Sequence, residues 1–178
     1  MTEQATNGAA GAASQNPNQP VFALQRVYIK DASYEAPNAP QIFQEQAQPE
    51  LQLNLGQKVN KLGEGVFEVI LTVSLTCTVN SKNAYLAEVQ QAGIFTVAGF
   101  DAQNTDGLLG TYAPNTLFPY ARRAISDLVQ DGGFPPFLLQ PINFEQVYAD
   151  VLRKRQEQAQ EAQAAATDAT PSPDAGHA

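Results

Sequence analysis

An apolar side chain stands at every second position through the thirteen residues from Phe67 to Val79. Side chains alternate between two faces along a β-strand, so this pattern predicts one long strand with an apolar face and a face rich in threonine and serine. At about 3.4 Å per residue the strand spans roughly 40 Å, whereas strands of about 5–6 residues are usual. The rest of the chain has little apolar material to cover such a strand. We therefore expect a second copy of the same chain to cover it.

Composition divides the 178 residues into three parts. Residues 1–19 contain no aromatic or branched aliphatic side chain, and residues 153–178 are rich in alanine and glutamine. Such segments bury too little apolar surface to offset the entropy of ordering. We expect a disordered N-terminal tail at residues 1–19, one domain with its own core at residues 20–152, and a disordered or partly helical C-terminal tail at residues 153–178.

The charge balance is acidic, with 18 Asp and Glu against 10 Lys and Arg and a net charge of −8. Nucleic acids and anionic membranes attract basic surfaces, so neither is an expected partner. The N-terminal segment lacks the charged and apolar regions of a signal peptide, and no apolar run approaches the roughly 18 residues of a membrane span. We therefore expect a cytoplasmic protein with no direct membrane insertion.

Three further segments complete a predicted set of four strands: residues 21–29, 50–62 and 85–97. Residues 21–29 are apolar on both faces, which predicts a strand buried on two sides. Short turns join the last three strands in sequence, which favours an antiparallel sheet. Gly93 interrupts the last strand and marks either a bulge or a close approach of another segment.

The second half of the chain shows the periodicity of helices. One helix is predicted to start at Leu117, with Pro119 near its first turn, and to end at the Gly132-Gly133 pair. Asn143 is suited to cap a last helix, whose apolar side chains recur on one face through Leu152. Four strands followed by two helices place the domain in the α+β class.

The domain lacks the side chains that many catalytic sites use. The only histidine is His177, near the C-terminus, and the only cysteine, Cys77, lies on the apolar side of the long strand without an activating partner. Two carboxylate pairs are possible acid–base groups but fit solvated surface better: Asp31 with Glu35, and Asp101 with Asp106. We expect no enzyme activity, no catalytic residue, no metal and no cofactor.

Apolar side chains also gather in two irregular, proline-containing segments, residues 30–49 and 134–141. Proline disfavours regular structure, and a loop as long as residues 30–49 inside a compact domain is usually functional. Both segments could simply pack on their own sheet. Alternatively, they could form a groove for apolar peptide segments, because stiff apolar walls lose little entropy on binding, and a nearby sheet edge could add backbone hydrogen bonds.

Four motifs in order along the chain resemble the SecB family of bacterial protein-export chaperones: YIKDASYEAPNAP at 28–40, EVQQAGIF at 88–95, PNTLFPYAR at 114–122 and FPPFLLQPINF at 134–144. The resemblance covers residues 21–152. It implies a four-stranded antiparallel sheet with two helices packed on one side, assembling as a dimer of dimers. It also implies an ATP-independent chaperone that holds unfolded preproteins in the cytosol and delivers them to the translocase motor SecA.

The resemblance implies roles for three sets of residues. An acidic face of the sheet that docks SecA matches Asp31, Glu35, Leu86 and Glu88. Positions that influence tetramer assembly match Ala87, Val89 and Gln91. The candidates for an apolar preprotein groove are Ile42, Phe43, Phe134, Phe137, Leu138 and Phe144.

The chain departs from the family pattern in the loop before the second strand. Close relatives carry a tryptophan there, whereas this chain has no tryptophan and Ala47 takes that place. We therefore expect a groove with one aromatic contact fewer and an altered substrate preference.

Two other functions stay open. A SecB-like chaperone dedicated to one toxin–antitoxin system would share the fold and differ in having a narrow range of clients. A small-molecule carrier or hydrolase would need a closed pocket with convergent polar groups.

Overall fold

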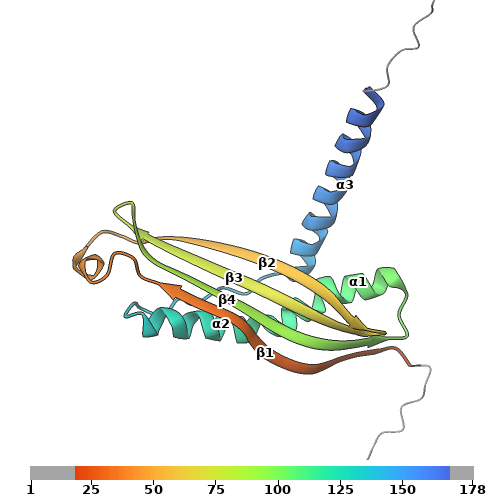
Figure 1. The fold of residues 1–178 in the computed structure, drawn as a ribbon, viewed down its shortest axis with the longest axis horizontal. Coiled ribbons are helices and arrows are strands. Elements are labelled where there is room, and N and C mark those ends of the chain that lie inside the picture. The colour runs from red at the N-terminus through yellow and green to blue at the C-terminus, as the bar shows by residue number, and fades with distance from the viewer. Residues whose placement is uncertain (1–18, 169–178) are drawn as a thin grey trace, which may run out of the picture.

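The computed structural model describes residues 19–168, and their side chains through residue 160. Four strands form one antiparallel sheet in the order β1-β4-β3-β2: β1 (Val21–Glu35), β2 (Glu50–Gly63), β3 (Val66–Val79) and β4 (Lys82–Ala98). Three α-helices follow: α1 (Ala102–Gly110), α2 (Tyr112–Asp131) and α3 (Phe144–Asp168). The predicted α+β fold with a four-stranded antiparallel sheet is confirmed (Figure 1).

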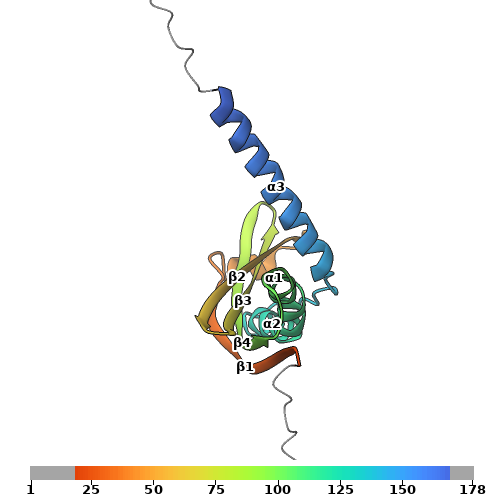
Figure 2. The ribbon, with the colours of Figure 1, turned by 90° about the vertical axis from the view of Figure 1, so that its right-hand side faces the viewer.

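Helices α1 and α2 lie end to end on one face of the sheet, and the other face carries no helix (Figure 2). Helix α1 was not predicted from the sequence. Helix α3 begins where the sequence predicted, and the Oδ1 atom of Asn143 accepts the backbone N–H groups of Glu145 and Gln146. It then continues through Asp168, past the expected domain boundary at residue 152, and projects away from the sheet (Figure 1). Residues 1–18 and 169–178 of the expected tails lie outside the described residues.

The apolar face of β3 is covered within one copy of the chain, which corrects our first expectation. From Val69 to Val79 its helix-side residues are at most 8% exposed. Helix α2 packs on β3 and β4, and its 20 residues extend about 30 Å along them. The uncovered apolar surface lies one strand further out, on the edge strand β2.

Strand β1 is longer and more exposed than predicted. It extends to Glu35, pairs only with β4 and is mostly exposed, whereas we expected a short strand buried on both faces. An edge strand tolerates charges because half of its surroundings are solvent. This explains why Lys30, Asp31 and Glu35 belong to the strand and not to the predicted loop, and the irregular segment is therefore residues 36–49.

Helix α2 begins earlier than predicted. Pro119 lies inside α2 and Pro114 lies in its first turn, so the predicted helix start was too late.

The strand ladder passes through Gly93 without a register shift. A Cβ atom there would lie 2.8 Å from the Cδ2 atom of Leu117. Of the two alternatives for Gly93, the close approach of another segment is therefore correct.

Among the described helices, none is both long enough and apolar enough to cross a membrane.

Candidate functional site

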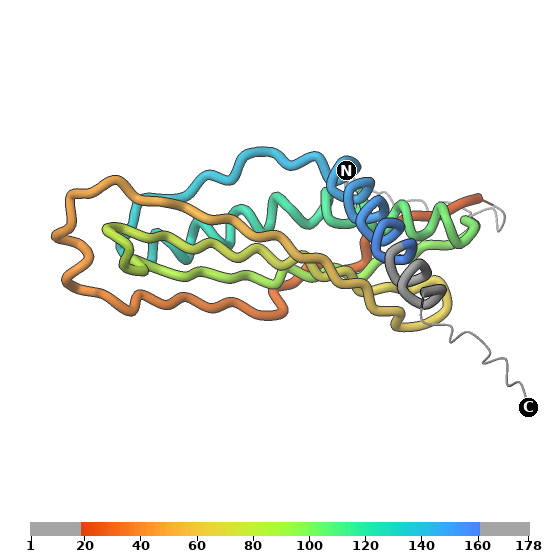
Figure 3. The backbone as a smooth tube through the Cα atoms, turned by 90° about the horizontal axis from the view of Figure 1, so that it is seen from above, coloured from red at the N-terminus to blue at the C-terminus, as the bar shows by residue number. Residues whose placement is uncertain are grey.

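An uncovered apolar strip runs along β2 on the helix side of the sheet. Leu51, Leu53, Leu55 and Val59 pair in register with buried residues of β3 and therefore point to the same face. Helix α2 does not reach over β2, and these four side chains are 37–44% exposed. Figure 3 shows the linker between α2 and α3 running back along the same edge of the sheet. A cleft opens at each end of this strip, and we call the strip together with its two clefts the groove.

The first end of this groove is an aromatic cleft of about 420 Å³. Its walls come from the irregular loop, the start of β2 and the linker. The ring of Phe134 lies 5.1 Å from that of Phe43 and 4.9 Å from that of Tyr85, measured between centroids. The floor includes Cys77, and burial raises the pKa of its thiol, which therefore stays protonated. The cleft is lined by Ile42, Phe43, Glu45, Ala47, Pro49, Leu51, Cys77, Val79, Tyr85 and residues 133–137.

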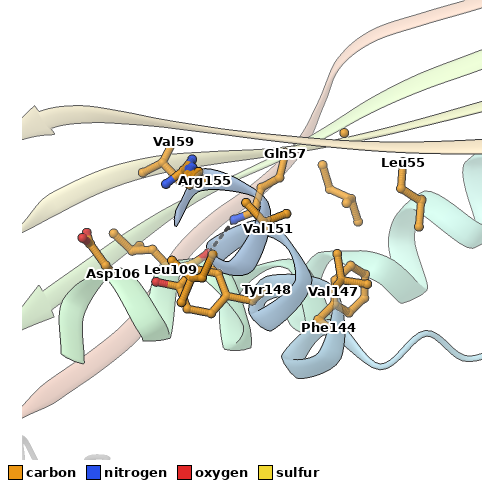
Figure 4. A pocket seen from close by; sticks show the side chains of 14 residues that line it. Leu55, Gln57, Val59, Asp106, Leu109, Phe144, Val147, Tyr148, Val151 and Arg155 are labelled. Carbon is orange, nitrogen blue, oxygen red and sulfur yellow. Dashed lines mark hydrogen bonds between the residues drawn. The ribbon is translucent and has the colours of Figure 1, made fainter. Parts of the chain in front are cut away.

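The second end is a helix cleft of about 440 Å³ between β2, α1 and α3 (Figure 4). Leu55 and Val59 face Val147 and Val151 of α3 across it. Gln57 interrupts the apolar strip, and its Nε2 atom donates a 2.7 Å hydrogen bond to the carbonyl oxygen of Leu109 at the end of α1. This bond ties the edge strand β2 to α1 and closes the floor of the cleft.

The start of α3 packs closely on the end of α1, where the ring of Tyr148 contacts Gly110. A Cβ atom at Gly110 would lie 2.4 Å from the ring of Tyr148, so only glycine admits the tyrosine at that distance. Together with the buried ring of Phe144, this contact places the apolar side of α3 over the helix cleft.

The structure groups the predicted groove residues unevenly. Ile42, Phe43, Phe134 and Phe137 line the aromatic cleft together, and Phe144 lies in the helix cleft. Leu138 does not line either cleft. It is 62% exposed and lies in a separate depression beside α2, with Phe118, Pro119 and Arg122 among its neighbours.

Sequence reasoning missed the contribution of β2 and α3 to this groove. The alternation from residue 50 to 62 did place Leu51, Leu53, Leu55 and Val59 on one face. The pattern did not predict that the helices would leave these four side chains of β2 exposed. The apolar stripe of α3 was likewise predicted, but of its residues only Phe144 was assigned to the groove.

The predicted docking residues lie together on the opposite, helix-free face. Glu35 pairs with Leu86, and Ser33 pairs with Glu88, so these positions share one side of the sheet. A register shift between Ile29 and Asp31 leaves Lys30 as an extra residue. Because a bulge reverses the alternation that follows it, Asp31 and Glu35 point away from the helices whereas Ile29 points toward them.

Serine and carboxylate side chains order this face. The Oγ atom of Ser74 on β3 donates a 2.6 Å hydrogen bond to the Oε2 atom of Glu88 on β4. Glu88 is only partly exposed, whereas Asp31 and Glu35 are exposed on the edge strand. The face therefore presents one hydrogen-bonded carboxylate beside two exposed ones, which suits a basic partner.

Further along the same face, Glu68 joins three strands. Its carboxylate accepts hydrogen bonds from Lys30 and Tyr28 of β1 and from Asn60 of β2. The bond from the Lys30 ammonium is 2.7 Å long and is also an ion pair. These donors lower the pKa of the Glu68 carboxyl to about 2, and the hydrogen bond from Lys30 has the largest effect. The carboxylate stays ionised at neutral pH and fastens both edge strands to the centre of the sheet.

Comparison with known proteins identifies the family. The profile of the SecB family, described as preprotein translocase subunit SecB, matches residues 15–156. The chain belongs to the SecB family. Protein-export protein SecB of Stenotrophomonas maltophilia (strain K279a) is 59% identical over 158 residues, which cover 89% of this chain and 91% of that protein. Protein-export protein SecB of Xylella fastidiosa (strain Temecula1) is 54% identical over 155 residues, which cover 87% of this chain and 90% of that protein.

A solved structure supports the SecB-like fold. It is a SecB-like chaperone of Mycobacterium tuberculosis in complex with a peptide from the HigA1 antitoxin. The TM-score is 0.58 at 17% sequence identity, over 68% of this chain and 90% of that chain. At this identity the likeness concerns the fold alone. The family resemblance that the four sequence motifs indicated is confirmed by the profile and the relatives.

Four further family positions can now be located. Ala47, where the SecB resemblance predicts a tryptophan, lines the aromatic cleft. Ala87, Val89 and Gln91 are at most 3% exposed on the helix side of β4. The Nε2 atom of Gln91 donates to the carbonyl oxygen of Tyr28. These three residues are covered within the protomer, so any influence on assembly would be indirect, through the elements that pack on them.

Proposed function

We propose that the chain is an ATP-independent chaperone that holds unfolded preproteins in the cytoplasm in an export-competent state and delivers them to SecA. The observation that carries this proposal is the open apolar groove along β2, with a cleft at each end. Large apolar side chains left exposed on a contiguous surface mark a site of interaction. Membership of the SecB family, whose curated relatives are named protein-export proteins, supports the same function.

The groove suits an extended, apolar chain segment. Its clefts would take large side chains of the client, and the unpaired edge of β2 could supply backbone hydrogen bonds that do not depend on the client's sequence. A folded protein buries such segments and pairs its backbone groups. Binding of this kind therefore distinguishes unfolded from folded proteins, without catalysis or a cofactor.

The docking of SecA is proposed for the helix-free face. Asp31, Glu35, Leu86 and Glu88 share that face. Because the groove lies on the helix side, a client and SecA could bind the same protomer at once. Release of the client would then follow from competition by SecA for the preprotein.

We also propose a homotetramer, as a dimer of dimers. Large side chains remain exposed on α2, beside it and on the edge strand β1: Tyr112 and Tyr120 on the helix, Leu138 beside it, and Ile29 on the strand. Several grooves on one assembly could hold one client together, since weak sites on one particle add through effective concentration.

A folding assay tests the proposed function. A denatured preprotein is diluted into buffer with and without this protein, in the absence of nucleotide, and its folding is followed by fluorescence. We expect arrest of folding at stoichiometric concentrations of the protein and release of the arrest when SecA is added. Unchanged folding in the presence of the intact protein would contradict general chaperone activity and favour a single dedicated client.

A further inference from the structure

The loop at residues 36–49 is fastened to the turn between β3 and β4 by side chains. The Oε2 atom of Glu45 accepts a 2.6 Å hydrogen bond from the Nδ2 atom of Asn80. Its Oε1 atom accepts a 2.9 Å hydrogen bond from the ammonium group of Lys82. Nearer the start of the loop, the Nδ2 atom of Asn38 donates to the carbonyl oxygen of Asn83 at 2.9 Å. We call the contacts of Glu45 with Asn80 and Lys82 the loop clasp.

The turn that supplies the donors has a defined shape. Asn80 and Ser81 have φ angles of 50° and 61°, the left-handed pair typical of a tight two-residue hairpin. Asparagine tolerates this conformation better than most residues. Asn80 and Lys82 therefore lie in a tight hairpin turn of defined backbone geometry.

The fastened loop is one wall of the aromatic cleft. Ile42 is buried in the core, whereas the exposed ring of Phe43 packs on the ring of Phe134. The backbone hydrogen bonds of the loop are short-range, such as those from the N–H of Phe43 to Pro40 and from the N–H of Glu45 to Ile42. Between Ile42 and the start of β2, the clasp is thus the polar contact that joins this wall to the sheet.

We propose that Glu45 is a positioning residue that sets the width of the aromatic cleft by holding the loop to the β3–β4 turn. This inference rests on the proposed function, because the width matters only if the cleft binds clients. The ion pair is partly exposed, with 26% of the Glu45 side chain and 57% of the Lys82 side chain accessible. Exposed pairs contribute little to global stability, so loss of the clasp should change the cleft and leave the fold intact.

The alternative role for Glu45 is direct attraction of basic clients, since it also lines the cleft. Lys82 does not line the cleft, and substitutions on both sides of the pair therefore separate the two roles. Removal of Lys82 would loosen the loop in a positioning role. In direct attraction, its removal would leave client affinity unchanged or raise it.

The experiment compares Glu45→Lys, Lys82→Glu and the double exchange of both residues in the full chain. Client affinity is measured with a fluorescently labelled unfolded preprotein, and hydrogen exchange is measured at the amides of Ile42, Phe43 and Glu45. Glu64→Lys, in the exposed β2–β3 turn, introduces the same charge change as Glu45→Lys far from the cleft and is the control. We expect each single substitution to raise the client Kd about fivefold and to speed exchange in the loop. The double exchange should return both readouts to within twofold of wild type, and the control should change neither.

Two results would overturn the proposal. One is a Kd within twofold of wild type for Glu45→Lys or Lys82→Glu. The other is a double exchange that restores slow hydrogen exchange but leaves client affinity reduced. Hydrogen exchange reports the clasp even if no client binds, so absence of client binding by the wild-type chain would count against the proposed function and not against the clasp itself.

Discussion

The double substitution Leu51→Asp and Leu55→Asp is expected to weaken binding of an unfolded client by at least ~30-fold. It places one carboxylate in the aromatic cleft and one in the helix cleft. A client that covers the exposed part of each leucine gains about 1 kcal/mol per side chain from burial. A carboxylate at the same place adds a cost of desolvation without a partner. The combined loss exceeds about 2 kcal/mol, and titration of a labelled unfolded preprotein measures it.

The matched control is Gln52→Asp with Asn54→Asp. These residues alternate with the two leucines on the same strand, are exposed, and face the helix-free side. The control adds the same two charges to the same edge strand, so any general effect of charge or of strand stability appears in both double variants. Equal affinities of the two variants would show that the β2 strip is not the client site.

The substitution Glu88→Lys is expected to weaken SecA binding by at least ~30-fold and to leave client affinity within about twofold of wild type. It replaces a carboxylate that Ser74 holds in place with a cation on a face that also carries Asp31 and Glu35. Loss of one member of a buried charge pair across an interface costs about 2–5 kcal/mol. Binding of SecA to the immobilised protein and titration of an unfolded client on the same sample measure the two effects.

Glu64→Lys is the control for charge reversal, because it makes the same change in an exposed turn away from the docking face. Equal weakening of SecA and client binding by Glu88→Lys would contradict the assignment of separate sites on the two faces of the sheet. Undiminished SecA binding would remove the helix-free face as its docking surface.

The sequence predicted the parts of the fold that depend on simple periodicity. The alternation from Phe67 to Val79 corresponds to β3, and the glycine pair at residues 132–133 ends α2. Helix α1 escaped prediction because its segment AQNTDGLLG has little apolar periodicity and is stabilised in part by the cap at Asp101, whose carboxylate accepts the N–H of Asn104. Local pattern therefore predicted elements with a strong apolar face and missed a short capped one.

Features that depend on tertiary placement could not be predicted in the same way. Leu138 and Leu139 are adjacent and chemically identical, yet the first is 62% exposed and the second is 1% exposed. The direction of the linker determines which of the two leucines enters the core, and no pattern in the segment FPPFLLQP predicts that direction. The bulge at Lys30 was also not predictable from the sequence. It turns Asp31 to the helix-free face, and no glycine or proline marks its position.

The candidate groove was predicted only in part, because its β2 side also depends on tertiary placement. The aromatic residues of the loop and linker stood out because apolar side chains are unusual in proline-rich segments. The leucines of β2 looked like ordinary strand residues, and only the position of α2 over β3 and β4 shows that they stay uncovered.

The most direct test of the account is a single tryptophan placed in the aromatic cleft by Ala47→Trp, because the chain has no other tryptophan. The variant is titrated, without nucleotide, with a preprotein that lacks tryptophan, once unfolded and freshly diluted from denaturant and once folded. We predict that emission moves to shorter wavelength and saturates with the unfolded preprotein, and stays unchanged with the folded one. Unchanged emission with the unfolded preprotein, or equal shifts with both forms, would contradict the claim that this cleft binds unfolded chains.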